Sequence, residues 1–205
     1  MFYLTKDGPG LPRDPFSAII SPRPIAWISS RGADGATNLA PYSFFNAVAY
    51  TPPQIMVSSI GKKADRARGK DSFSHISETG VFCVNIAGYD DREALNQSSA
   101  DYPREISEFE ALRLEMAECE TIACPRLAHA PASLECRLTQ ILELEGAHNL
   151  LVLARVEAIH LRDDCISPEG RFDVTRFRPL TRLGYMDFAS IDSVFAMKRP
   201  KLDNK

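Results

Sequence analysis

The chain has 205 residues, of which 44% are hydrophobic and 25% are charged, and its formal net charge is -3. This length suits one domain with its own core, and the hydrophobic content excludes an intrinsically disordered chain. The acidic balance argues against nucleic-acid binding, which needs a basic surplus to neutralise phosphates. No apolar run approaches the roughly 20 residues of a membrane span, and the N-terminus lacks the pattern of a signal peptide. We therefore expect a single cytoplasmic domain over 1–205, with no membrane or nucleic-acid partner.

Several stretches rich in β-branched and apolar residues, bounded by proline or glycine, have the pattern of β-strands. They cover residues 24–30, 39–50, 54–60, 81–87, 133–145 and 149–162. In the last two, apolar positions recur with a period of two around Gly146-Ala147, which predicts a long antiparallel hairpin. Short helices are predicted over 71–78, 90–97 and 105–112, the last within a polar stretch, 99–126, that we expect to cross the surface. Long strands with brief helices predict a mainly β barrel and not a Rossmann sheet.

The cysteines and histidines show no pattern of metal ligands or paired disulfides. There are five cysteines, an odd number, and no CxxC pair occurs among them. Cys83 and Cys136 lie inside apolar or alternating runs, where we expect small buried hydrophobes. The four histidines are far apart in the sequence, so we expect no metal site.

The segment 61–70 carries five cations and one anion in an otherwise mildly acidic chain. It follows Ser58 and Ser59, and its last residue, Lys70, precedes the helix that includes Ser72. Hydroxyl groups, a lysine and the free N–H groups of a helix start suit a phosphate monoester. A solvated basic loop explains the same residues, and the pattern alone leaves both interpretations open.

The segment 38–47 places asparagine and serine among aromatic residues on a strand interrupted by Pro41. Proline confines such a strand to an edge or a bulge. Free backbone groups beside aromatic side chains would suit a flat heteroaromatic ligand. The alternative is a core strand whose aromatic residues only pack, and Trp27 faces either that core or the same site.

His148 follows a glycine-containing turn at the start of a predicted strand. A histidine in this position can hydrogen-bond a substrate or transfer a proton near neutral pH. The alternative is a solvated turn residue without a role in the site. A second basic spot contains Arg176, Arg178 and Arg182, and its role is equally open.

Taken together, these segments resemble the flavin reductase-like family. The likeness is carried by 21–30 (SPRPIAWISS), by 38–46 (NLAPYSFFN), by Pro52-Pro53, and by Lys70-Asp71-Ser72, which is close to the family's Lys-Asp-Thr. It continues through 79–86, 133–136 and 146–156, so it covers about residues 17–186 and leaves 187–205 as a C-terminal tail. The resemblance implies a six-stranded Greek-key FMN-binding split barrel with a few short helices. It also implies a homodimer with FMN at the subunit interface.

The resemblance further implies which residues bind FMN. Along the isoalloxazine ring would lie Trp27, Ile28, Ser29, Ser30, Ala40, Pro41, Tyr42, Ser43 and Asn46. The phosphate would be held by Ser58 or Ser59, with Lys70 and Ser72. This second group coincides with the anion site that the charge pattern indicates.

The implied reaction is hydride transfer from NADH or NADPH to the flavin, with the protein orienting both. Many family members carry Gly-Asp-His at this turn, with the histidine near the flavin or nicotinamide. This chain has Gly146-Ala147-His148, so the histidine is kept, and any role of the acid in orienting it is lost. We expect a flavin reductase that supplies reduced flavin to a flavin-dependent monooxygenase. The alternatives are a flavoredoxin-like electron carrier fed by a protein donor, and a non-catalytic flavin-binding protein. Because no GxGxxG follows a strand, the barrel and its dimer partner would bind the nicotinamide.

Overall fold

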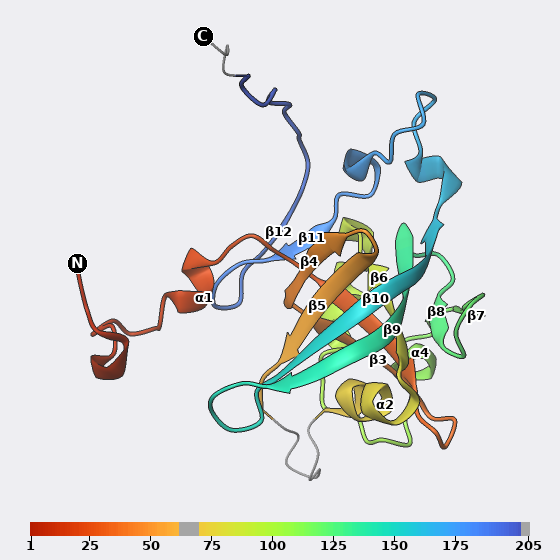
Figure 1. The fold of residues 1–205 in the computed structure, drawn as a ribbon, viewed down its shortest axis with the longest axis horizontal. Helices are drawn as coiled ribbons and strands as arrows, with labels where there is room; N and C mark the ends of the chain where they lie inside the picture. The colour runs from red at the N-terminus through yellow and green to blue at the C-terminus, as the bar shows by residue number, and fades with distance from the viewer. Residues whose placement is uncertain (62–69, 202–205) are drawn as a thin grey trace.

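The computed structural model describes residues 1–61 and 70–201, and its main feature is a curled antiparallel sheet of seven strands in the order β3-β2-β6-β9-β10-β5-β4 (Figure 1). The strands are β2 Ala26–Arg31, β3 Thr37–Tyr42, β4 Phe44–Tyr50, β5 Pro53–Ser59, β6 Val81–Ile86, β9 Ala132–Glu143 and β10 Leu150–Leu161. β3 and β4 follow each other in the chain, yet they form opposite edges of the sheet. The sheet therefore curls into a half-barrel, and the mainly β split-barrel prediction is confirmed.

The strand count differs from the predicted six because the stretch expected as one strand over 39–50 is divided at Ser43. Pro41, two residues earlier, has no N–H group for a ladder, which fits its place on an edge strand. The divided stretch pairs with β2 on one side and with β5 on the other. The continuous segment from β3 to β4 therefore supplies both edge strands of the curled sheet.

The long hairpin is formed by β9 and β10, which pair from Glu143 with Leu150 to Ala132 with Leu161. In its turn, the Leu144 N–H donates to the Asn149 carbonyl at 2.9 Å. Gly146 has a φ of 93° there, and a side chain at this position would meet the Asn149 amide nitrogen at 2.7 Å. The positive φ favours glycine here, and a larger residue would also displace the Asn149 side chain.

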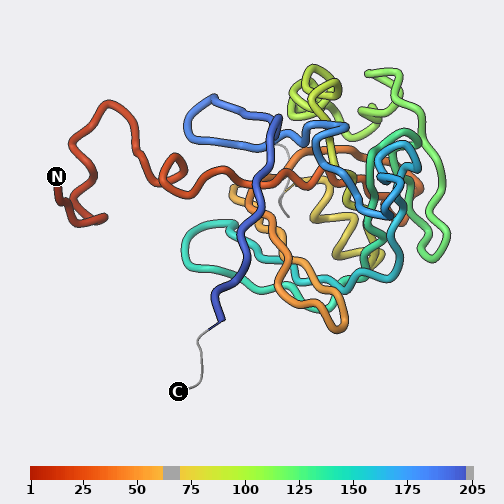
Figure 2. The backbone as a smooth tube through the Cα atoms, turned by 90° about the horizontal axis from the view of Figure 1, so that it is seen from above, coloured from red at the N-terminus to blue at the C-terminus, as the bar shows by residue number. Residues whose placement is uncertain are grey.

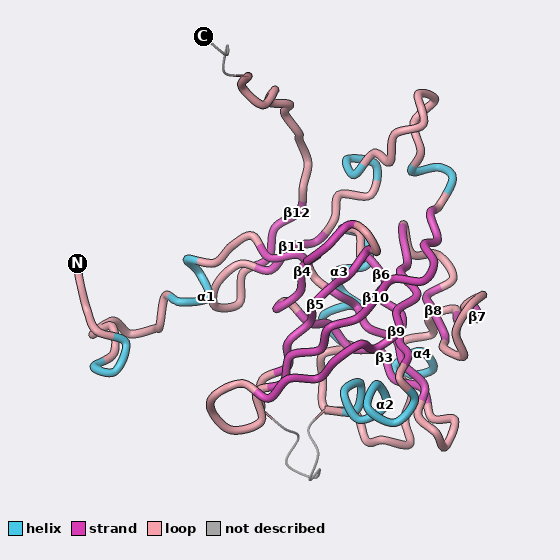
Figure 3. The backbone as a smooth tube through the Cα atoms, viewed as in Figure 1, coloured by secondary structure: helices cyan, strands magenta, loops and turns pink. Residues whose placement is uncertain are grey.

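The helices are short and lie at the periphery of the curled sheet (Figure 3). They are α1 Phe16–Ile19, α2 Asp71–Thr79, α3 Arg92–Gln97 and α4 Glu108–Ala111, with 3-10 turns at Thr5–Asp7, Tyr89–Asp91, Asp163–Cys165 and Val174–Arg176. α2 agrees with the predicted helix over 71–78, whereas α3 and α4 are shorter than predicted. α2 packs against β2 and β3 and ends at Gly80, whose φ is 71°. None of the helices in the described ranges is long and apolar enough to cross a membrane.

Two small sheets escaped the sequence prediction. One is the hairpin of β7 Met116–Glu118 and β8 Pro125–Leu127, which lies within the predicted surface stretch 99–126. The other contains β1 Arg23–Pro24, β11 Leu180–Arg182 and β12 Phe188–Ser190. Strands of two or three residues carry too little alternation to be detected in a sequence. The expected tail over 187–205 accordingly begins with a strand, and from 191 to 201 the chain extends away from the barrel (Figure 2).

The core has an inner and an outer part, separated by the sheet. The inner part fills the curl, and the outer part lies beneath α3 and α4. Because successive strand residues point to opposite faces, neighbouring residues of β2 divide between them: Ile28 belongs to the inner part and Trp27 to the outer part. Cys83 and Cys136 are fully buried, as expected.

Candidate functional site

A pocket of about 320 Å³ lies where the end of β5, the start of α2 and the β9–β10 turn meet. All three lie at the same end of the barrel (Figure 1). Ser59, Lys70 and His148, predicted as site residues from separate parts of the sequence, line it together. Phe73 and Asn149 complete much of its wall. We call this cavity the hairpin pocket.

The hydroxyl of Ser59 is the most informative atom of the hairpin pocket. Ser59 is only 4% exposed, and its Oγ has no hydrogen-bond partner among the described residues. Leaving a buried hydroxyl unpaired costs about 1–3 kcal/mol, so a polar ligand group would stabilise this arrangement. Ser58 points to the other face of β5 and is not among the described residues that line the pocket.

Lys70 stands at the N-terminus of α2. It is the N-cap residue, with φ -85° and ψ 154°, so the N–H groups that follow it in the first turn point out of the helix without intrahelical partners. Its Nζ lies 5.5 Å from the centroid of the Tyr42 ring, within cation–π range. The remaining cations of the predicted basic segment, in 62–69, lie outside the described residues.

Lys70 also lines a smaller cavity of about 80 Å³ along β3, with Ala40, Pro41 and Tyr42 in its wall. Burial raises the pKa of Tyr42, against the opposing effect of the nearby Ser72 hydroxyl, so this tyrosine is neutral. The small cavity thus brings three residues predicted for the ring beside the lysine predicted for the phosphate. We call it the β3 cavity.

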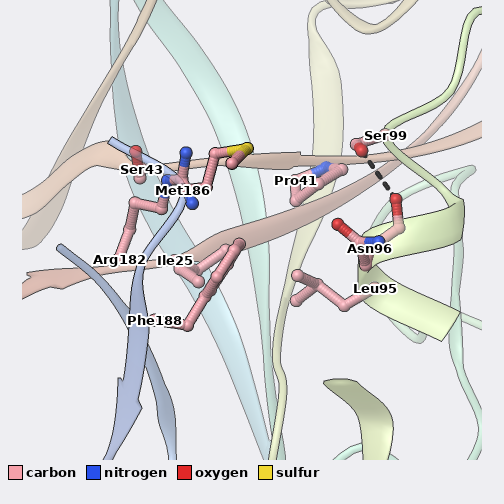
Figure 4. A pocket seen from close by; sticks show the side chains of 9 residues that line it. All are labelled: Ile25, Pro41, Ser43, Leu95, Asn96, Ser99, Arg182, Met186 and Phe188. Atoms are coloured by element: carbon pink, nitrogen blue, oxygen red, sulfur yellow. Dashed lines mark hydrogen bonds between the residues drawn. The ribbon is translucent and has the colours of Figure 1, made fainter. Parts of the chain in front are cut away.

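A third cavity, of about 290 Å³, adjoins the β3 cavity because both are lined by Pro41 and Ser99. Figure 4 shows Leu95 and Ser99 on one side of it and Arg182 and Phe188 on the other. Ser43, another residue predicted for the ring, belongs to the same wall. The Arg182 guanidinium carbon lies 4.4 Å from the centroid of the Phe188 ring, which places a cation at this cavity.

The β2 residues predicted for the ring lie instead in the interior. Ile28 is in the barrel core. The Ser29 hydroxyl donates to the Pro125 carbonyl at 2.7 Å, and the Ser30 hydroxyl bonds His75 Nδ1 at 3.1 Å. The reason is that β2 is an interior strand of the sheet, with the inner part of the core on one face and the outer part on the other.

Trp27 is buried in the same way. It is 1% exposed, and its Nε1 donates to Ser98 Oγ at 2.9 Å. A Ser98→Ala substitution should therefore leave a buried indole N–H unpaired and lower the free energy of unfolding by about 1–3 kcal/mol. Chemical denaturation measures this loss. Ser99→Ala is the matched control, because that neighbouring hydroxyl also bonds a backbone carbonyl but is exposed. Equal losses in both variants would contradict the assigned role of Ser98.

Ser72 and Asn46 complete the predicted set. Ser72 is fully buried, and its Oγ accepts a hydrogen bond from Asn38 Nδ2 at 2.7 Å. Asn46 is exposed on β4, and its side chain accepts from the Ala47 N–H at 2.8 Å. Asn38 was not singled out from the sequence, although it opens the predicted 38–47 segment. It connects β3 to the first turn of α2, next to Lys70.

The curled sheet has the architecture of a split barrel. The hairpin pocket lies at the end of β5, and the other two cavities lie along the edge strand β3. The flavin reductase like domain family matches residues 19–181. The chain therefore belongs to the flavin reductase-like family. The family expected from the sequence motifs is therefore confirmed.

Known relatives agree with this assignment. An uncharacterised protein of Deinococcus radiodurans is 36% identical, over 73% of this chain and 66% of its own. Another, from Halalkalibacterium halodurans, is 31% identical over 89% of this chain and 88% of its own. Their functions are not known, so these relatives support the family and not an activity.

Solved structures extend the comparison. Nitrilotriacetate monooxygenase component B from Bacillus cereus has a TM-score of 0.81 and 32% identity, over 89% of this chain and 90% of that one. The 2-nitrobenzoate 2-nitroreductase of Pseudomonas fluorescens has a TM-score of 0.79 and 28% identity, over 90% and 88%. Flavoredoxin of Desulfovibrio vulgaris, at 18% identity and a TM-score of 0.75 over 86% and 90%, shares the fold.

Proposed function

We propose that this protein binds FMN and acts as an NAD(P)H-dependent flavin reductase. The observation that carries the proposal is the buried hydroxyl of Ser59, which has no partner among the residues that the structure describes and shares one pocket with Lys70. A hydroxyl donor, a cation and the N–H groups of a helix start are the groups that bind a phosphate monoester. The adjoining cavities offer Pro41 and Ser43 to a flat ring. When bound, FMN would supply the hydride-accepting chemistry.

In this proposal, the cofactor contacts come from the residues that line the cavities. Ser59 and Lys70 hold the phosphate, and the edge strand from Ala40 to Ser43 lies along the ring. The buried β2 residues lie beside β3 in the sheet, where Trp27 pairs with Pro41 and Ile28 with Ala40. Their part is to fix the position of the strand, and not to touch the flavin.

His148 has the role of positioning the nicotinamide nucleotide. Its side chain is exposed and its φ is 61°, a left-handed conformation that is unfavourable for a residue other than glycine. The turn thereby presents an imidazole at the mouth of the hairpin pocket. An uncharged or protonated imidazole can donate a hydrogen bond to a nucleotide phosphate or amide.

Replacing His148 by alanine should raise the Michaelis constant for NADH or NADPH several-fold, with little change in FMN affinity. The expected loss corresponds to one hydrogen bond, or about 1 kcal/mol. Steady-state kinetics with varied nucleotide measures it. His129→Ala is the control, because His129 is an exposed histidine that lines none of the three cavities described above. An unaltered Michaelis constant and turnover number in His148→Ala would remove this role.

The proposal includes a homodimer with FMN at its interface and a flavin-dependent monooxygenase as the acceptor of reduced flavin. Large hydrophobic side chains are exposed near the closing edge of the barrel, including Val48, Tyr50 and Ile60. Burying such side chains against a second subunit would be favourable. Light scattering with and without FMN measures the oligomeric state. A monomer under both conditions would contradict the interface.

The decisive experiment for the activity is the visible absorbance of the protein with FMN, recorded without oxygen before and after NADH or NADPH is added. A flavin reductase should bleach the flavin band faster than a protein-free control, and the faster nucleotide identifies the preferred donor. A bound flavin spectrum that neither nucleotide bleaches would contradict the reductase and favour an electron carrier. Absence of a bound spectrum would contradict FMN binding altogether.

A further inference from the structure

Three cysteines gather beside the β7–β8 hairpin, outside the cavities of the proposed flavin site. Cys83, on β6, and Cys124, before β8, are fully buried, while Cys119, after β7, packs against them and is half-buried. The cluster therefore combines one half-buried cysteine with two that are fully buried. Nothing in the proposed function uses it.

Cys119 and Cys124 face each other across the end of the hairpin. Glu118 pairs with Pro125 in the last register position of β7 and β8, and the next residue on each side is a cysteine. The Cys119 N–H donates to the Cys124 carbonyl at 3.0 Å. Residues opposed across antiparallel strands have Cα separations within the range that a disulfide spans.

The electrostatic environment shifts the pKa values of these thiols in opposite directions. Hydrogen bonds from the Cys124 and Cys83 thiols lower the pKa of Cys119, against burial and the Glu135 carboxylate, which raise it, and His160 lowers it further. The hydrogen bond to Cys119, together with burial, raises the pKa of Cys124. Burial likewise raises the pKa of Cys83. These opposite shifts favour the thiolate at Cys119, which is the reactive form towards oxidants, and the thiol at Cys124.

A metal site does not explain the cluster. Within 1–61 and 70–201, no three or more histidine, cysteine or acidic side chains are arranged to hold a metal ion. Cys124 Sγ instead lies 3.3 Å from the Ser29 carbonyl, in the position of a thiol donor. A half-buried cysteine opposed by a fully buried one across the end of a hairpin has the geometry of a peroxide-sensitive site and its resolving cysteine.

We propose that Cys119 is an oxidation site for hydrogen peroxide and that Cys124 resolves it as an intramolecular disulfide. The Cys119 thiolate attacks one peroxide oxygen, a sulfur–oxygen bond forms, the oxygen–oxygen bond breaks, and the second oxygen leaves as water after taking up a proton. The Cys124 sulfur then attacks the Cys119 sulfur, releasing its proton, and the sulfenic oxygen leaves as a second water. Two thiols are oxidised as one peroxide is reduced. A dithiol reductant restores both thiols by exchange.

Peptide mapping of the full-length protein tests this directly. The protein is reduced, treated with hydrogen peroxide, alkylated and digested with trypsin, which cuts after Arg113 and Arg126 and so releases 114–126 with both cysteines. We expect this peptide to lose two hydrogens and to resist alkylation until a dithiol is added. A cross-link from 114–126 to the peptide containing Cys83, or full alkylation after peroxide treatment, would overturn the assignment of Cys124.

Variants separate the two steps. Cys124→Ser should leave Cys119 as a sulfenic acid that dimedone traps, and Cys119→Ser should abolish both the disulfide and the trapping. Cys165→Ser is the control, because Cys165 is a buried cysteine of the 3-10 turn Asp163–Cys165, and it should behave as the unaltered protein. Dimedone trapping at any other cysteine in Cys119→Ser would contradict Cys119 as the reactive thiol. The map of the unaltered protein decides the question even if one variant does not fold.

Discussion

Replacing Lys70 by methionine should raise the dissociation constant for FMN by about ten- to a hundredfold. Methionine keeps much of the aliphatic stem over Tyr42 but removes the cation. A hydrogen bond to a charged group contributes about 1.5–3 kcal/mol, and each 1.4 kcal/mol is a factor of ten in affinity. Fluorescence titration with FMN measures the change.

Riboflavin separates the phosphate from the ring in this experiment. It lacks the phosphate group, so the Lys70→Met variant and the unaltered protein should bind it equally. Lys198→Met serves as the control variant, because Lys198 is exposed and lines none of the three cavities described above. If Lys70→Met weakened both ligands alike, or left FMN affinity unchanged, Lys70 would not be the phosphate ligand.

Ser59→Ala gives an independent view of the same pocket. The substitution removes a buried hydroxyl that has no partner within 1–61 and 70–201, so the ligand-free protein should be as stable as before or slightly more stable. FMN affinity should fall at the same time. A loss of ligand affinity without a loss of stability is typical of a binding-site residue, which is retained for its ligand at a cost in stability.

Replacing Glu135 by alanine should lower the free energy of unfolding by about 3–5 kcal/mol, because removing one partner leaves a buried polar network unpaired. Glu135 is 0% exposed. Its carboxylate accepts hydrogen bonds from the Glu120 and Thr121 N–H groups and the Thr121 hydroxyl, and it lies 2.6 Å from His160 Nε2. It therefore anchors the loop between β7 and β8 to the sheet. Chemical denaturation at neutral pH measures the loss.

A matched control exists in the chain. Glu115 also lies 2.6 Å from a histidine, His129, but its side chain is 68% exposed. Exposed ion pairs contribute less than about 1 kcal/mol, so Glu115→Ala should change stability little. Losses of equal size in the two variants would show that burial is not the source of the effect.

The pH dependence of stability provides a second test of Glu135. Burial would raise its pKa, but hydrogen bonds from Thr121, Glu120 and His160 outweigh burial and lower the pKa to about 2. The unfolded chain has a glutamate pKa near 4.3. The stabilisation is therefore complete above about pH 4.3 and is lost as the pH falls through about 2. The difference between the unaltered protein and Glu135→Ala should narrow over that window, and a constant difference would contradict the assignment.

The sequence by itself determined the strands and the long hairpin, because alternation over twelve residues in β9 and β10 is a strong local signal. It also identified Ser59, Lys70 and His148 as candidates, since each stands at the end of a predicted element. The strands of β7, β8, β11 and β12 were not predicted because three residues carry no periodicity. The family followed from the order of motifs along the chain.

Only the tertiary structure decided which of the candidate residues share a pocket. A strand pattern shows alternation, but it does not show which face meets a neighbouring element, and so Ser58 and Ser59 were equivalent in the sequence. Burial on both faces of β2 depends on α2, α3, α4 and β8, which are distant from it in the chain, and this burial turned Trp27 into a core residue. The opposition of Cys119 and Cys124 likewise needed the register of a hairpin whose short strands the sequence did not reveal. Alternation is a property of consecutive residues and can be recognised in the sequence. Burial depends on which distant elements the fold packs against each face of a strand.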